Sequence, residues 1–202
     1  DWWYPTKLEE TLKFLDTEDV IFHDLDIYGG PEKPTGMVKG FNLKPDVFIN
    51  LMVYGNAIAN SSAVVRKSII EKVNGVDESK DIVAVPDYDL WLKIAKVTNK
   101  FHYIKKSLGG YWLAAGQNMT AASEKQIRMY EAIYAKYAED LTLKDQEKAL
   151  ALVDYSKARI YHKLKKYPDA KKFYLSALKS VRNDIKMKSI AGLTLSMAKK
   201  HY

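Results

Sequence analysis

Apolar positions follow two different patterns along the chain, which divide it near residue 122. Over residues 1–122, β-prone runs alternate with segments in which apolar residues recur at helical spacing. The first expected element is a helix of about ten residues behind Pro5, which carries Leu8, Leu12 and Leu15. It is followed by a strand over 19–28, a loop over 31–46, a strand over 61–66, a helix over 69–73, a helix over 87–97, and strands over 101–104 and 109–113. The helix over 69–73 is expected to be capped by Ser68 and to stop at Asn74 and Gly75. This alternation predicts an α/β fold whose mixed, mostly parallel sheet is flanked by helices.

Beyond residue 122 the apolar spacing is helical only. A stripe of apolar and aromatic residues follows Ser123 and consists of Ile127, Tyr130, Ile133, Tyr134 and Tyr137, and we expect two or three further helices behind it. Residues 167–178 have the spacing Y-x-x-A-x-x-x-Y-x-x-A-L, which resembles the second helix of a tetratricopeptide repeat. One such hairpin is not a solenoid, so we interpret residues 123–202 as an all-α appendage that packs rather than binds peptides.

Charge is distributed unevenly between these two parts. Residues 1–120 hold 14 Lys and Arg against 16 Asp and Glu, a net charge of −2, whereas residues 121–202 hold 18 against 9, a net charge of +9. Such a basic tail can meet anionic membrane lipid through its summed field, and a solvated, lysine-rich helical surface is the alternative. Nucleic acid is not an expected partner, because no groove-reading motif is present and tyrosines at helical spacing are typical of a core.

Composition narrows the class of protein. Apolar residues make up 47% of the chain and aromatic residues 12%, which favours a folded domain over disorder. The absence of cysteine excludes disulfides and thiolate metal sites. The uncharged stretch over 47–65 is interrupted by asparagines and serines and does not predict a membrane span, and no signal peptide is visible. We therefore expect a cytoplasmic protein, peripheral on the inner face of the membrane if the basic tail binds lipid.

Three acidic clusters are candidates for chemistry. Asp1 precedes two tryptophans, Asp24 and Asp26 lie at the end of the expected strand over 19–28, and Asp87 and Asp89 begin a helix. The last pair also has a structural interpretation, since acids near a helix N-terminus stabilise it by about 0.3 to 1 kcal/mol.

The order of these clusters and of their neighbours resembles the family 2 glycosyltransferases. The matching segments cover about 120 residues and are 1–9 (DWWYPTKLE), 19–24 (DVIFHD), 60–67 (NSSAVVRK), 73–78 (VNGVDE), 87–92 (DYDLWL) and 110–119, which holds GY and GQNM. The resemblance implies a GT-A type domain that transfers a sugar, with inversion, from a nucleotide-diphosphate sugar to a glycan or lipid-linked acceptor.

The same resemblance implies roles for particular residues. Asp1 matches the last acid of the D-x-D motif, which binds Mn²⁺ or Mg²⁺. Asp87 matches the base that deprotonates the acceptor, and its neighbour Asp89 would raise the pKa of Asp87 through like-charge repulsion. The residues expected to bind donor or acceptor are Trp2, Asp24, Asn60, Ser61 and Asn118, and acceptor specificity is expected in loops within residues 29–59.

Departures from the family pattern qualify this interpretation. Pro86 stands where a glutamate usually precedes the base, and Trp112 and Ala114 stand at the later arginine and histidine positions. The strand and helix units that bind the nucleotide would precede Asp1, so the chain matches the acceptor-side part, and we expect an incomplete enzyme that associates with a second copy through an open sheet edge. A non-catalytic glycan-binding or protein-binding module is the alternative. We expect Trp91 to be a core residue.

Overall fold

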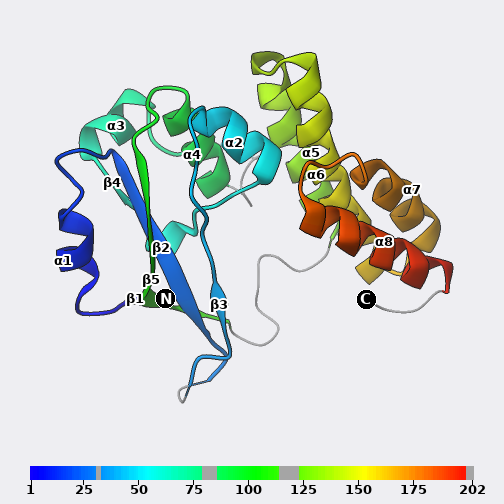
Figure 1. The fold of residues 1–202 in the computed structure, drawn as a ribbon, viewed down its shortest axis with the longest axis horizontal. Coiled ribbons are helices and arrows are strands. Elements are labelled where there is room, and N and C mark those ends of the chain that lie inside the picture. The colour runs from blue at the N-terminus through cyan, green and yellow to red at the C-terminus, as the bar shows by residue number, and fades with distance from the viewer. Residues whose placement is uncertain (31–32, 79–85, 114–122, 199–202) are drawn as a thin grey trace. The chain divides into compact units, whose positions relative to one another are not determined.

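The structure is a computed structural model that describes residues 1–30, 33–78, 86–113 and 123–198. The chain forms two compact units, one that contains the β-sheet and one made of helices (Figure 1). The elements of the first unit are β1 (Trp2–Trp3), α1 (Lys7–Leu12), β2 (Val20–Tyr28), β3 (Gly36–Val38), the first five residues of α2 (Val47–Tyr54), the 3₁₀ turn η1 (Asn60–Ser62), β4 (Val64–Val65), α3 (Lys67–Lys72), α4 (Pro86–Ala95) and β5 (Phe101–Trp112). Those of the second are α5 (Glu124–Tyr137), the 3₁₀ turn η2 (Ala138–Asp140), α6 (Leu143–Lys163), α7 (Tyr167–Ala177) and α8 (Asn183–Met197). The expected domain boundary between residues 122 and 123 lies at the edge of a described range and stays a prediction.

The sheet is mixed, as expected, but it is not mostly parallel. Its strand order is β1-β5-β2-β3, with β4 also beside β2. Within the described ranges β2 and β5 run parallel, whereas β1, β3 and β4 each pair antiparallel with a neighbour. The segment from β2 to β5 holds several helices and is long enough for the crossover that a parallel pair needs.

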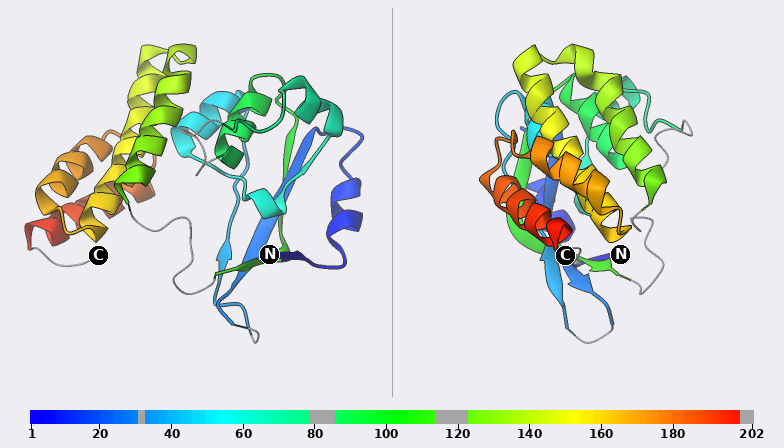
Figure 2. Two further views of the ribbon diagram at one scale, coloured as in Figure 1. Left: turned by 180° about the vertical axis from the view of Figure 1, so that it is seen from behind. Right: turned by 90° about the vertical axis from the view of Figure 1, so that its right-hand side faces the viewer.

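Strand β2 is the centre of the first unit. Val20, Ile21, Phe22 and Leu25 are fully buried. Figures 1 and 2 show α1 on one side of the β2–β5 pair and α2 and α4 on the other, so both faces of the pair are covered. This explains why the β2 sequence is a continuous apolar run at its start rather than an alternating one.

Several expected elements differ from the observed ones in type or extent. β5 is one strand instead of two, because the exposed Lys105 and Lys106 lie where its register against β2 shifts rather than in a turn. β3 and α2 occupy stretches that we interpreted as loop, and the expected strand over 61–66 is reduced to η1 and the two residues of β4.

The ends and faces of the short helices also differ from expectation. α3 begins after Arg66 without a side-chain cap, so Ser68 is not its cap. Its end is as expected: Asn74 and Gly75 have φ of 58° and 62°, and their amides donate to carbonyls of the last turn. In α1, Leu8 and Leu12 are exposed, and the buried face is formed by Lys7 and Thr11 instead.

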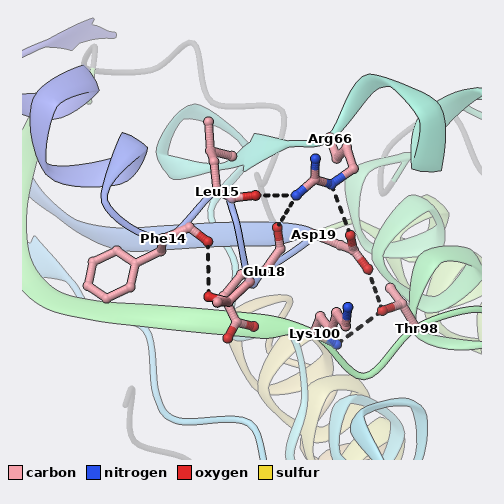
Figure 3. Close-up of polar contacts among 8 residues, drawn as sticks. Phe14, Leu15, Glu18, Asp19, Arg66, Thr98 and Lys100 are labelled. Atoms are coloured by element: carbon pink, nitrogen blue, oxygen red, sulfur yellow. Dashed lines mark hydrogen bonds and ion pairs between the residues drawn. The ribbon is translucent and has the colours of Figure 1, made fainter.

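A network of polar contacts surrounds Asp19 at the amino end of β2 (Figure 3). Arg66 Nε donates to Asp19 Oδ1 at 3.1 Å, and Thr98 Oγ1 donates to Asp19 Oδ2 at 2.6 Å. Arg66 Nη2 also donates to the carbonyls of Leu15 and Glu18. The network ties the segment before β2 to the residue after β4 and to the turn before β5. We interpret it as structural, because these polar groups form hydrogen bonds with one another.

The helical unit is organised around the α6–α7 pair. Its core cluster consists of Tyr155, Ala158, Ala170, Tyr174, Ala177 and Ile185. The alternation of large and small residues over 167–178 is thus confirmed as a packing pattern. Within residues 123–198, three α-helices follow α5. Ser123 caps α5 by accepting a hydrogen bond from the amide of Gln126 at 3.3 Å. Among the helices of the described ranges, none meets the length and apolarity needed to cross a lipid bilayer.

Candidate functional site

Three segments far apart in sequence meet at Asp1, beside the carboxyl end of β5. Asp1 Oδ1 accepts a hydrogen bond from the backbone amide of Trp112 at 2.9 Å, and its Oδ2 accepts one from the hydroxyl of Ser61. Asp1 is nevertheless exposed. The carboxylate is therefore oriented from two sides and still open to solvent, as a ligand-binding carboxylate must be.

The carbonyl of Ser61 holds η1 against β1 and α1. It accepts hydrogen bonds from Trp3 Nε1 at 3.1 Å and from Lys7 Nζ at 3.0 Å. The Lys7 ammonium also lies 4.0 Å from the centroid of the Trp3 ring, in a cation–π contact. Lys7 is fully buried, and this burial lowers its pKa to about 8. Lys7 thus supports the position of Ser61, and with it that of Asp1.

Two phenols and a carboxylate lie together near the end of β2. The hydroxyl of Tyr4 donates to Asp26 Oδ2 at 2.8 Å and lies 3.0 Å from the hydroxyl of Tyr28. Burial, followed by these hydrogen bonds, raises the pKa of Tyr4 above its usual value. Tyr4 therefore stays a neutral donor at physiological pH.

Asp24 is nearly buried in the middle of β2. Its Oδ1 accepts from the hydroxyl of Tyr103 at 2.6 Å and from the amide of Gly40 at 2.9 Å. These contacts attach the loop before α2 to the sheet. Direct contact of Asp24 with a sugar stays a prediction, and the contacts observed for it are structural.

Trp2 lies across the backbone of β5. It pairs with Gly110 in the sheet, and its ring centroid is 4.8 Å from that of Tyr28. A Cβ on Gly110 would overlap the indole, so glycine is what lets the ring approach the strand. Trp2 and Trp112 remain 40% and 44% exposed.

Asp87 and Asp89 lie in the first turn of α4, behind Pro86. Burial raises the pKa of Asp87, and the hydrogen bond that its carboxylate accepts from the amide of Tyr88 at 2.8 Å opposes this increase. The direction is the one expected, but the cause is burial and not repulsion from Asp89. Asp89 is fully buried in the packing of α4, and Trp91 is a core residue as predicted, at 2% exposed.

The structure thus brings the expected residues together in part. Asp1 and Ser61 are in contact, Trp2 lies over the same end of β5, and Asp24 is in the neighbouring strand. Asn60 lies in η1 and is exposed. Asn118 lies outside the described residues.

Sequence reasoning missed three residues of this region. Lys7 and Tyr4 lie in the segment that carries the resemblance, yet they were given no role, and Tyr28 was only the end of a strand. One feature of the sequence could have identified them. Polar side chains that need a hydrogen-bond partner when buried, such as Lys7, interrupt the apolar or β-prone patterns.

Asp1 supplies a single carboxylate, whereas Mg²⁺ or Mn²⁺ is bound by about six ligand atoms. In the described part of the chain, no three His, Asp or Glu side chains lie together in a way that would hold a metal ion. The described residues therefore do not form a metal site by themselves, and metal binding at Asp1 stays a prediction.

Comparison of the chain with protein-family models, with curated proteins and with solved structures found no significant match.

Proposed function

We propose that residues 1–122 are the acceptor-side part of a GT-A type glycosyltransferase that uses a nucleotide-diphosphate sugar. The observation that supports this most is the contact of Asp1 with Ser61 and with the amide of Trp112, across 60 and 111 residues of sequence. Asp1 and Ser61 belong to two separate segments of the resemblance, and the resemblance implies that both lie at one site.

The proposed reaction is a single displacement with inversion. The acceptor hydroxyl oxygen attacks the anomeric carbon while the bond from that carbon to the diphosphate oxygen breaks, and the diphosphate leaves with the electron pair. The carboxylate of Asp87 takes the proton of the hydroxyl. Its pKa, raised by burial, brings it closer to the basicity that this step needs.

Partners and cofactor belong to the same proposal. The donor is a nucleotide-diphosphate sugar and the acceptor a glycan or a lipid-linked sugar. Mn²⁺ or Mg²⁺ would neutralise the leaving diphosphate, and Asp1 would supply one of its ligands. The basic residues of 121–202 would hold the protein at an anionic membrane surface, where lipid-linked acceptors lie.

A non-catalytic glycan-binding module is the second candidate. It is favoured by the exposed side chains of Trp2 and Trp112, which offer apolar faces to a sugar whether or not transfer follows.

A transfer screen separates the two candidates. The full natural protein that contains this sequence is incubated with Mn²⁺, a panel of UDP-, GDP- and dTDP-sugars and simple glycoside acceptors, with and without EDTA. We expect release of nucleoside diphosphate that EDTA abolishes, and a product whose anomeric configuration, measured by NMR, is opposite to that of the donor. Glycoside binding without turnover of any donor would favour the binding module, and a product with retained configuration would contradict a single displacement.

A further inference from the structure

Three aromatic side chains come from neighbouring strands at one end of the sheet, and we call Trp2, Tyr28 and Trp112 the aromatic shelf. Trp2 lies in β1, Tyr28 ends β2, and Trp112 ends β5. Tyr28 and Trp112 are partners in the sheet register, and the rings of Trp2 and Tyr28 are inclined by 49°. An apolar surface therefore spans the ends of three strands.

The position of the Trp2 ring is fixed by the strand beneath it. Gly110 leaves space for the indole, and a Cβ on Gly109 would lie 2.7 Å from the carbonyl oxygen of Trp2. Two successive glycines inside a strand weaken it, and here they permit a close approach of ring and backbone. The indole is thus preorganised while 40% of the side chain stays exposed. The two glycines therefore fix the position of the indole without burying it fully.

Polar groups adjoin the shelf at Tyr28. Its hydroxyl lies 3.0 Å from that of Tyr4, which donates to Asp26 Oδ2 at 2.8 Å. Asp26 is only half-buried, so the carboxylate and the two phenols can exchange hydrogen bonds with a ligand. An apolar face beside fixed acceptors and donors matches a pyranose ring, whose C–H face is apolar and whose hydroxyls lie at its edge.

We propose that the aromatic shelf binds a neutral hexopyranose ring, with the C–H face on Trp2 and the hydroxyls towards Asp26 and Tyr28. The identification of this ring as part of the acceptor rests on the proposed function. The binding of a sugar to the shelf does not depend on that function. The negative charge of Asp26 disfavours the two other ligands that stack on aromatic rings at such a surface, the phosphate-bearing nucleotide and the headgroups of anionic lipid.

Saturation-transfer NMR with methyl β-D-glucopyranoside and methyl β-D-galactopyranoside tests the shelf. The wild-type protein is expected to saturate the ring protons of at least one glycoside. Trp2→Ala should weaken that binding at least tenfold, and Tyr28→Phe, which keeps the ring, severalfold. Tyr54→Ala removes an aromatic side chain of similar exposure, 39%, outside the shelf and should bind within twofold of wild type. Gly110→Ala displaces the indole without removing it and should resemble Trp2→Ala.

Two results overturn the inference: no saturation of either glycoside by the wild type, or undiminished binding by a folded Trp2→Ala protein, with folding checked by the dispersion of its amide spectrum. The outcome is separable from that of the transfer screen. Binding without turnover leaves the shelf and removes the transferase, whereas turnover with an acceptor KM unchanged by Trp2→Ala leaves the transferase and removes the shelf.

Discussion

At the residue scale, Asp87 differs from an ordinary acid at the start of a helix. Asp169 lies in the first turn of α7, also directly behind a proline, but it is exposed, whereas Asp87 is half-buried with a raised pKa. An exposed acid stabilises a helix start through the dipole, while a buried carboxylate is costly when ionised. The proposed role of Asp87 as a base would account for a buried carboxylate at this helix start.

The stability of Asp87→Asn tests this difference. Because the pKa of Asp87 is raised in the folded protein, its favourable contribution is present at low pH and is lost as pH rises through the folded pKa. Asp87→Asn should therefore increase the free energy of unfolding at pH 7, with a gain that shrinks on acidification below that pKa. Asp169→Asn should lower the free energy of unfolding by about 0.3 to 1 kcal/mol. Urea denaturation at pH 7 and pH 4 measures both, and destabilisation by Asp87→Asn at pH 7 would contradict the account.

Lys7 gives a second prediction, in the opposite pH direction. Its pKa is lowered to about 8 by burial, so the unfolded chain binds more protons than the folded one between this value and about 10.4, the usual lysine pKa. The free energy of unfolding should rise from pH 7 to pH 9.5 in the wild type. Lys7→Met, which keeps an unbranched apolar chain but removes the ammonium, should lack this rise. Lys13→Met, an exposed control at the end of α1, should retain it. Equal pH profiles for wild type and Lys7→Met would show that Lys7 is not buried as described.

At the element scale, the packing of α8 depends on Gly192. A Cβ at this position would overlap the ring of Tyr174, which is fully buried between the helices. Alanine is a better helix former than glycine by about 1 kcal/mol, so propensity alone predicts stabilisation. Overpacking of a core costs about 1 to 3 kcal/mol, and we expect it to dominate.

Gly192→Ala should therefore destabilise the helical unit by up to about 2 kcal/mol, the difference of those two effects. Ala191→Ser, at an exposed neighbouring position, is the control and should change stability by less than about 0.5 kcal/mol. Thermal unfolding followed by circular dichroism measures both variants. Stabilisation by Gly192→Ala would mean that α8 does not pack on Tyr174.

Elements with a clear period were predictable from sequence, and those that depend on long-range partners were not. β2, α4 and the α6–α7 pair follow their apolar spacing. In α1 the leucine stripe suggested the wrong buried face, because contacts of Lys7 with Ser61 and Trp3 override it. The site shows the same limit. The acids could be identified as candidates from sequence, but the contact of Asp1 with Ser61 depends on the long-range hydrogen bonds that hold η1 against β1 and α1.

At the scale of the whole molecule, charge is the dominant asymmetry, with a net +9 in residues 121–202. Several lysines of the helical unit form ion pairs, such as Lys157 with Glu131 at 2.5 Å and Lys179 with Glu147 at 2.9 Å. These pairs reduce local fields but leave the net charge unchanged. The surplus can attract an anionic surface over about a Debye length, roughly 10 Å at 0.1 M salt.

Vesicle sedimentation tests this attraction. The protein should bind phosphatidylglycerol vesicles at low salt, release at 0.5 M NaCl, and not bind phosphatidylcholine vesicles. The double variant Lys171→Gln, Lys172→Gln should bind more weakly, at about 1 kcal/mol per lysine near the surface. Lys105→Gln with Lys106→Gln, an exposed pair in β5, should bind like the wild type. Equal binding to neutral vesicles would contradict the electrostatic account.

The most direct test of the central claim is the transfer rate of Asp87→Asn beside that of Asp169→Asn in the full natural protein. We expect turnover of a nucleotide-diphosphate sugar to fall by about 10² to 10⁴-fold in Asp87→Asn, the usual contribution of a general base, while sugar binding is retained. Asp169→Asn, which makes the same change at an exposed helix start, should transfer at the wild-type rate. Equal transfer rates for the two variants would contradict the assignment of Asp87 as the base.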